Sequence, residues 1–138
     1  MTNPLSIALS GLNAASKRAN ASANNIANAG TSGATANGEG PQPYTPVDVV
    51  QTSVNTQDGA PQGVKSTYAP RENGTTTVYD PDAQYADESG LIAIPDVDLA
   101  TEIVNLKNAA NAYKANAAVI RVASEMEREM LQSFDETA

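Results

Sequence analysis

The sequence predicts a mainly α-helical chain with a small β-rich insertion. We expect a long helix near each end, the two forming a coiled-coil-like pair, with a small antiparallel sheet and loops between them. Apolar residues recur at helical spacing near both ends, whereas the middle is crowded with glycine, proline, threonine and asparagine. The 138 residues include no Trp, one Phe and five Tyr, so few side chains can fill a large core. Three segments are therefore expected: 1–33 (N-terminal helix), 34–95 (β-rich, loop-rich middle region) and 96–138 (C-terminal helix).

The first segment predicts an amphipathic helix over residues 5–28. Its apolar residues share one helix face and recur mostly every seven positions: Leu5, Leu12, Ala19 and Ile26, joined by Leu9 and Ala23. Thr2 or Asn3 suits the N-cap, Pro4 the first helical position, and Gly30 the end of the helix. Because Gly11 and several asparagines are poor helix formers, we expect this helix to be weak by itself and ordered by partners.

A polar column runs along the same helix. Its members follow each other at steps of three or four: Asn13, Lys17, Asn20, Asn24 and Asn28. The column is either a solvated face or a ladder of amides that bonds to the backbones of neighbouring subunits, because each amide can both donate and accept.

The middle segment predicts a small antiparallel sheet. Three short runs are rich in β-branched or aromatic residues and are bounded by turn formers: 47–52, 64–69 and 75–79. The pair Asn73-Gly74 predicts a two-residue hairpin, because both positions of a type I′ turn need a positive φ. The glycine-rich and proline-rich residues 30–43 predict a loop that is mobile or ordered only by contact.

The third segment predicts a long helix over residues 97–133, capped by Asp96 or Asp98. Its apolar residues first alternate steps of four and three, forming what we call the heptad stripe: Leu99, Ile103, Leu106, Ala110, Tyr113, Ala117 and Ile120. Farther along, apolar residues continue on a shifted face, the terminal stripe: Val119, Val122, Met126, Met130 and Phe134. The helix is therefore apolar on more than one side.

Composition excludes several classes of function. Without Cys or His, the chain cannot build thiolate or Ser-His-Asp chemistry, zinc-finger sites or haem sites that use those ligands. A net charge of −8 disfavours nucleic acid and anionic lipid as partners. The acidic run 80–88 departs from a calcium loop, because Tyr85 and Leu91 stand where that loop needs Gly and Glu. We expect a solvated turn there, and no enzyme activity, metal or cofactor.

No run of about 20 apolar residues predicts insertion into a membrane, and the N-terminus does not resemble a secretory signal peptide. If the protein leaves the cytosol, we expect another machine to export it.

Motifs near both ends resemble the bacterial flagellar basal-body rod protein family. Residues 22–31 (SANNIANAGT) are similar to the asparagine-rich signature that follows the first helix of rod and hook proteins. Residues 102–106 (EIVNL) and 113–116 (YKAN) resemble the C-terminal motif of the same group. Chain length and residues 78–98 most resemble the proximal-rod members, with a sister rod protein as the alternative.

The resemblance implies a structural, non-enzymatic subunit of the rod that crosses the periplasm, exported by the flagellar type III apparatus without a cleavable signal peptide. It implies copies of the chain and other rod proteins as partners, no small-molecule substrate, and terminal assembly helices that form the drive shaft. Expected interface residues are Leu5, Leu9, Leu12, Ala19, Asn24, Asn25, Ile26, Asn28, Leu99, Ile103, Leu106, Ala110, Tyr113, Asn116, Ala117, Ile120 and Met126. The alternative from another class is a coiled-coil adaptor or secretion-system component that binds a helical partner without polymerising.

Overall fold

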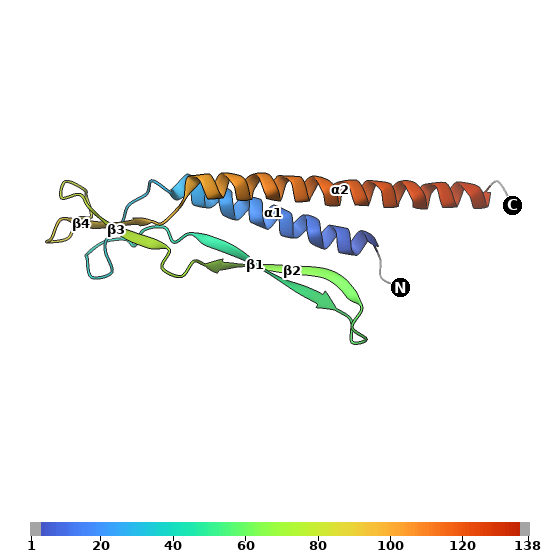
Figure 1. Cartoon of the computed structure of the whole chain (residues 1–138), viewed down its shortest axis with the longest axis horizontal. Helices are drawn as coiled ribbons and strands as arrows, with labels where there is room; N and C mark the ends of the chain where they lie inside the picture. The colour runs from blue at the N-terminus through green and yellow to red at the C-terminus, as the bar shows by residue number, and fades with distance from the viewer. Residues whose placement is uncertain (1–3, 136–138) are drawn as a thin grey trace.

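The computed structural model describes residues 4–135, with side chains through Ser133, and has six elements. The expected cap at Thr2 or Asn3 lies outside the described residues. In chain order the elements are α1 (Pro4–Asn28), β1 (Val47–Asn55), β2 (Pro61–Pro70), β3 (Thr75–Tyr79), β4 (Leu91–Pro95) and α2 (Leu99–Asp135). The molecule is elongated, with α1 and α2 side by side and α2 running past the N-terminal end of α1 (Figure 1). The predicted helix pair and β-rich insertion are confirmed.

The two helices pack through small side chains. Apart from prolines, the fully buried aliphatic side chains described are seven alanines and Ile92, and Ala15 and Ala109 are completely inaccessible. Gly11 gives Asn116 room, because a Cβ at position 11 would lie 2.5 Å from the Asn116 Oδ1. Neither helix, within residues 4–135, has a stretch apolar enough to cross a bilayer.

The insertion contains two antiparallel two-stranded sheets. The first is the hairpin of β1 and β2, which lies along α1, and the second pairs β3 with β4 at the end of the molecule opposite the end of α2 (Figure 1). Side chains of α1 bond to β2: the Val64 N–H donates to Ser10 Oγ at 3.1 Å and Lys17 Nζ donates to the Ser66 carbonyl at 2.6 Å. These bonds fix the hairpin on the helix.

The predicted hairpin at Asn73-Gly74 is wrong. The strands on either side of this turn belong to different sheets, since β2 pairs with β1 and β3 pairs with β4. Asn73 has a φ of 53°, but Gly74 has no positive φ, and the turn closes with the Gly74 N–H donating to the Arg71 carbonyl at 3.2 Å. Asn73-Gly74 therefore forms a turn, but not a hairpin, because the strands on either side of it pair with other strands.

Strand β4 was not predicted, and the acidic run does not lead directly into the last helix. Residues 80–90 instead connect β3 to β4. The Asp87 carboxylate accepts bonds from the Ser89 and Leu91 N–H groups and from Thr35 Oγ1, which ties this loop to the glycine-rich segment. Gly33 forms a two-bond bridge with Ala93 of β4, so residues 30–43 are ordered by contact.

Asp98 caps α2, as predicted. Its Oδ1 accepts from the Ala100 N–H at 3.0 Å and its Oδ2 accepts from Thr101 Oγ1 at 2.6 Å. These hydrogen bonds, the one from the Thr101 hydroxyl first, hold the pKa of Asp98 below its ordinary value. Asp96 instead joins the turn before β3, because its N–H donates to the Gly74 carbonyl.

The Gly11→Leu variant tests the close contact of the helices. We expect it to lower the free energy of unfolding by about 1–3 kcal/mol, because overpacking at this contact outweighs the better helix propensity of leucine. The control is Asn13→Leu, which places the same side chain on an exposed position of α1. Urea unfolding followed by circular dichroism measures both; equal midpoints for the two variants would contradict the close packing at Gly11.

Candidate assembly interface

A cluster of polar side chains around the buried Glu102, which we call the polar junction, joins α1, α2, β1 and the turn after β2. Its side chains are Ser22, Asn25, Tyr44, Asp48, Arg71 and Glu102. The Glu102 side chain is 2% exposed, although it is a carboxylate. Its Oε1 accepts from Asn25 Nδ2 at 2.9 Å and from Arg71 Nη2 at 2.9 Å. Glu102 of α2 is thus held by α1 on one side and by the β-rich region on the other.

Asn25 uses its full hydrogen-bonding capacity inside the chain. Besides the bond to Glu102, Nδ2 donates to the Val47 carbonyl at 3.0 Å, and Oδ1 accepts from the Val47 N–H and the Tyr44 hydroxyl, each at 2.9 Å. An amide can donate two hydrogen bonds and accept two, so none of its capacity is left over. The side chain pairs with the backbone at the start of β1 as a neighbouring strand would.

Arg71 connects the junction to the surface. Its Nε and Nη2 bond to the two oxygens of Asp48 at 3.3 and 2.7 Å, and its Nη1 donates to the Asp96 carbonyl at 3.3 Å. Such two-point pairing fixes the plane of the guanidinium. Arg71 therefore holds together β1, the turn before β3 and the start of α2.

The charges of the junction stabilise each other. Burial raises the pKa of Glu102, but hydrogen bonds from Arg71, Asn25 and Ser22 and the Arg71 charge outweigh it, so the pKa lies below the ordinary 4.5. Hydrogen bonds to Asp48 and then to Glu102 raise the pKa of Arg71. Burial and the Glu102 charge raise the pKa of Tyr44. At neutral pH the junction thus holds an ionised carboxylate, a guanidinium and a neutral phenol.

The heptad stripe of α2 only partly faces α1. Leu106, Ala117 and Ile120 are half-buried, whereas the other four members are exposed: Leu99, Ile103, Ala110 and Tyr113. The side of α2 packed on α1 is centred on Glu102 and Ala109, with Ala112, Asn116 and Ala123 half-buried. This side is turned roughly 60° from the stripe, since each residue advances a helix by about 100°. Small side chains meet α1, and large ones stay outside.

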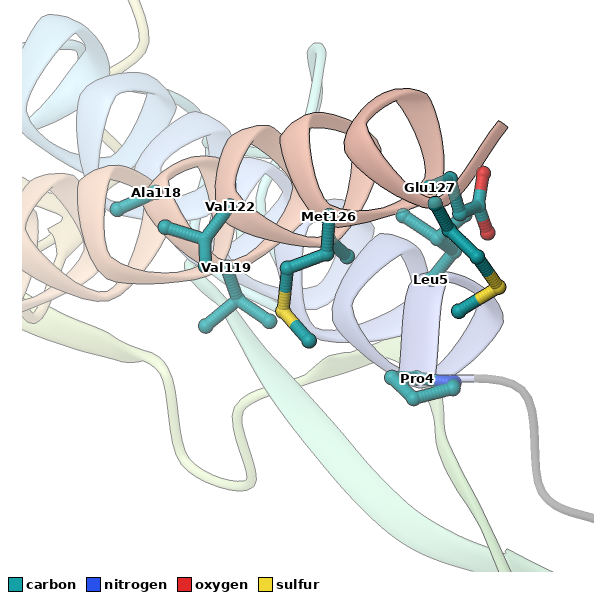
Figure 2. Close-up of a pocket in the computed structure, with 9 residues that line it drawn as sticks. Pro4, Leu5, Ala118, Val119, Val122, Met126 and Glu127 are labelled. Atoms are coloured by element: carbon teal, nitrogen blue, oxygen red, sulfur yellow. The ribbon is translucent and has the colours of Figure 1, made fainter. Parts of the chain in front are cut away.

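The terminal stripe lies on the other flank of the contact with α1. Val119, Val122, Met126 and Met130 are 48–61% exposed; the side chain of Phe134 lies outside the described residues. Pro4 and Leu5 of α1 border four of these side chains and form with them an apolar groove of about 540 Å³ (Figure 2). Nine of the fifteen exposed large apolar side chains among the described residues lie on α2. One helix therefore carries two separate uncovered apolar surfaces.

The expected interface residues of α1 fall into two groups. Leu5, Leu12, Ala19 and Ile26 are half-buried at the flank of the helix pair, while Leu9 and Asn24 are exposed. Asn13, Asn20 and Asn24 of the polar column are exposed, Lys17 bonds to β2, and Asn28 Nδ2 turns back to the Asn24 carbonyl at 2.9 Å. Asn25 is 1% exposed and acts within the chain.

Most residues of the polar junction carry no signal in the sequence that marks them as a site. Glu102 and Asn25 stood inside the two terminal motifs, but nothing in their spacing showed that they touch. Arg71 follows a predicted strand and had no local signal of its own. The sequence offered one hint: Glu102 is an acidic residue among apolar residues in the first turn of the helix, directly after the capping Asp98.

This architecture defines a class of protein. Paired terminal helices that leave large apolar surfaces on two flanks, with a β-rich appendage fixed to one end, are typical of a subunit of a larger assembly. No group of three or more possible metal-ligating side chains is placed to hold an ion in residues 4–135.

Comparison with known proteins agrees with this class. Residues 5–35 match the family described as flagella basal body rod protein, and residues 88–133 match the flagellar basal body rod FlgEFG protein C-terminal family. The flagellar basal-body rod protein FlgC of Escherichia coli O6:H1 is 35% identical over 132 residues, covering 91% of this chain and 92% of that protein. FlgC of Salmonella typhimurium is 34% identical with the same coverage, and FlgC of Yersinia enterocolitica is 34% identical, with 87% of each chain covered.

The chain belongs to the FlgC family of flagellar basal-body rod proteins and is a structural subunit of the rod. Its place is the flagellar basal body, where it assembles with other rod components. The predicted family and the predicted rod function are both confirmed.

Glu102→Ala tests the polar junction. We expect it to lower the free energy of unfolding by about 2–4 kcal/mol, because Asn25 and Arg71 lose a buried partner while Arg71 keeps Asp48. Glu88→Ala removes an exposed glutamate and serves as the control, with an effect within about 0.5 kcal/mol. Chemical unfolding at neutral pH measures both. A loss for Glu102→Ala no larger than that of the control would refute the role of the junction in stability.

The junction also predicts a pH dependence. Because the pKa of Glu102 is lowered by folding, its contribution to stability is complete above 4.5, the ordinary value, and is lost as the pH falls through the lowered value. Glu102→Gln should therefore lose less stability on acidification than the wild type, with the remaining loss coming from Asp98 and Asp87, whose pKa values are also lowered. Unfolding midpoints measured across the acidic range give the two slopes, and parallel slopes would contradict this assignment.

Proposed function

We propose that the chain forms part of the proximal rod and transmits torque through its two terminal helices. The observation that carries the proposal is the pair of apolar surfaces on α2, one on each flank of its contact with α1. In the assembled rod these surfaces face neighbouring subunits, so α1 and α2 line the inner tube and the β-rich region lies outside. The rod crosses the periplasm and acts as the drive shaft.

Two surfaces matter because a rod subunit needs at least two non-equivalent contacts to continue a helical array. An adaptor that binds one helical partner needs only one. The exposed part of the heptad stripe and the terminal stripe differ in composition as well as in position, since the first contains Ile103 and Tyr113 and the second contains Met126 and Met130. The comparisons likewise favour the rod subunit over an adaptor.

Partners and export follow from the same proposal. The partners are copies of this chain and other rod proteins, and the export route is the flagellar type III apparatus, without removal of a signal peptide. We propose no enzyme activity and no nucleic-acid, cofactor or small-molecule partner, and the net charge of −8 supports the exclusion of nucleic acid.

Ile103→Asp and Met126→Asp test the two surfaces separately. Both side chains are exposed, at 46% and 61%, so the free chain should fold normally. Each variant should be depleted at least tenfold from purified basal bodies, because an unpaired carboxylate would be buried between subunits. Immunoblots of basal bodies and the diameter of swimming rings measure this outcome.

The matched control is Asn111→Asp, which adds the same charge at an exposed position of α2 outside both stripes. It should assemble normally. If the Ile103→Asp or the Met126→Asp chain assembled to the wild-type level, the corresponding surface would not be an interface of the rod. Ile120→Asp is expected to be more severe than either variant, since Ile120 is half-buried within the chain itself.

A further inference from the structure

A second groove, of mixed polarity, lies between α1, β1 and α2. It has a volume of about 340 Å³, and its lining includes Arg18, Asp48, Glu102, Asn105 and Asn108. We call it the Arg18 groove. Its lining contains one cation, two carboxylates and two amides, and this composition suits the binding of a charged or polar group.

Arg18 is the unsatisfied member of this groove. Its Nε is buried and has no hydrogen-bond partner among the described residues, and no ion pair found in residues 4–135 includes it. The two carboxylates of the groove are already engaged, because Asp48 and Glu102 both bond to Arg71. A buried donor on a cation costs stability unless a partner is supplied. Nε itself is closed to another chain, so a partner from outside would bond to the terminal Nη groups of the same guanidinium. A carboxylate is the acceptor that best fits those groups.

Charge complementarity indicates where this carboxylate comes from. The sequence of α1 contains Lys17 and Arg18 and no acidic residue, whereas the part of α2 after Ser124 is acidic and includes Glu127 and Glu129. Glu125 lies 4.0 Å from Arg121 in a weak pair, but Glu129 has no ion pair among the described residues. Within one chain these carboxylates cannot reach Arg18, because about 20 residues of straight helix separate Asn108 from them, roughly 30 Å.

The groove and the terminal stripe lie on one side of α2. Asn105 and Asn108 are followed at steps of four and three by Ala112 and Ala115, and then by Val119. A helix end packed beside the Arg18 groove on this side needs a carboxylate for Arg18 and apolar side chains for the neighbouring turns of α2. The end of α2 fits that description, since it carries Met126 and Met130 beside Glu129.

We propose that the Arg18 groove receives the Glu129 carboxylate from the end of α2 in a second copy of this chain. The second copy lies displaced along the helix axis, so that its acidic end reaches the basic part of α1. Arg18 and Glu129 then form an ion pair between subunits, with Asn105 and Asn108 as additional donors. This contact rests on the proposed rod assembly and names the lateral partner of one of its faces.

A charge exchange tests the pair. Arg18→Glu should deplete the chain from basal bodies at least tenfold, because two carboxylates would then meet in a partly buried groove. Combining Arg18→Glu with Glu129→Arg should restore assembly to within about threefold of wild type, since this swap re-forms the pair. Lys107→Glu, an exposed lysine of α2 changed in the same way, should assemble normally. Failure of the double variant to recover, with both single variants depleted, would overturn the pairing.

Cross-linking identifies the partner directly, because the chain contains no cysteine. The variant carrying both Arg18→Cys and Glu129→Cys, treated with a short bismaleimide in isolated basal bodies, should give a band of twice the chain mass. A bismaleimide is needed because the Cα atoms of an Arg–Glu pair lie beyond the roughly 7 Å limit of a disulfide. Each single variant should give no such band.

The outcomes separate this inference from the proposed function. Absence of the cross-linked band, while the double-cysteine chain is present in basal bodies, would overturn the inference and leave the rod assignment intact. A band containing a different rod protein would also overturn it, because the occupant would then not be a second copy. Absence of the wild-type chain from basal bodies would instead remove the proposed function itself.

Discussion

The hydrogen-bonded contact between Glu102, Asn25 and Arg71 is the constraint on which the rest of the structure depends. Two sheets of two strands each are too small to be stable alone, and a helix with as many asparagines as α1 is weak alone. The buried Glu102 carboxylate joins them, since its partners come from α1 and from the turn between the sheets. Because Asn25 also bonds to both polar backbone groups of Val47, the position of β1 on the helices is fixed by the same contact.

The choice of small residues between the helices explains why the chain is incomplete by itself. Gly11, Ala15 and Ala109 let the helices approach closely, and that contact leaves no room for isoleucine, tyrosine or methionine. The large side chains of α2 therefore remain on its flanks, where their apolar area is exposed to water. The geometry that stabilises the monomer thus also creates the exposed surfaces that we propose as the sites of assembly.

Local signals in the sequence predicted the helices, three of the four strands and the cap at Asp98. They failed where pairing is decided by distant residues. β4 is a short apolar run next to a predicted helix, and its identity depends on β3 and on the bridge from Gly33 to Ala93. Asn73-Gly74 has the composition of a hairpin turn, yet the strands that flank it, β2 and β3, pair with β1 and β4 and not with each other. The spacing of the heptad stripe predicted a seam between the helices, but α1 packs beside the stripe, against Glu102 and Ala109, and four of the seven stripe residues are exposed.

The polar junction also bears on how a rod subunit could carry torque. A load applied to the helices reaches the β-rich region through the contacts that join the two, and apolar contacts between alanines resist sliding only weakly because they have no direction. Hydrogen bonds and a two-point ion pair are directional, so the bonds of Arg71 to Asp48 and Glu102 resist rotation of the appendage about the helix axis. Burying such a polar cluster adds little net stability compared with apolar packing. Its advantage is a defined orientation, which a shaft built from many copies needs more than it needs a stable monomer.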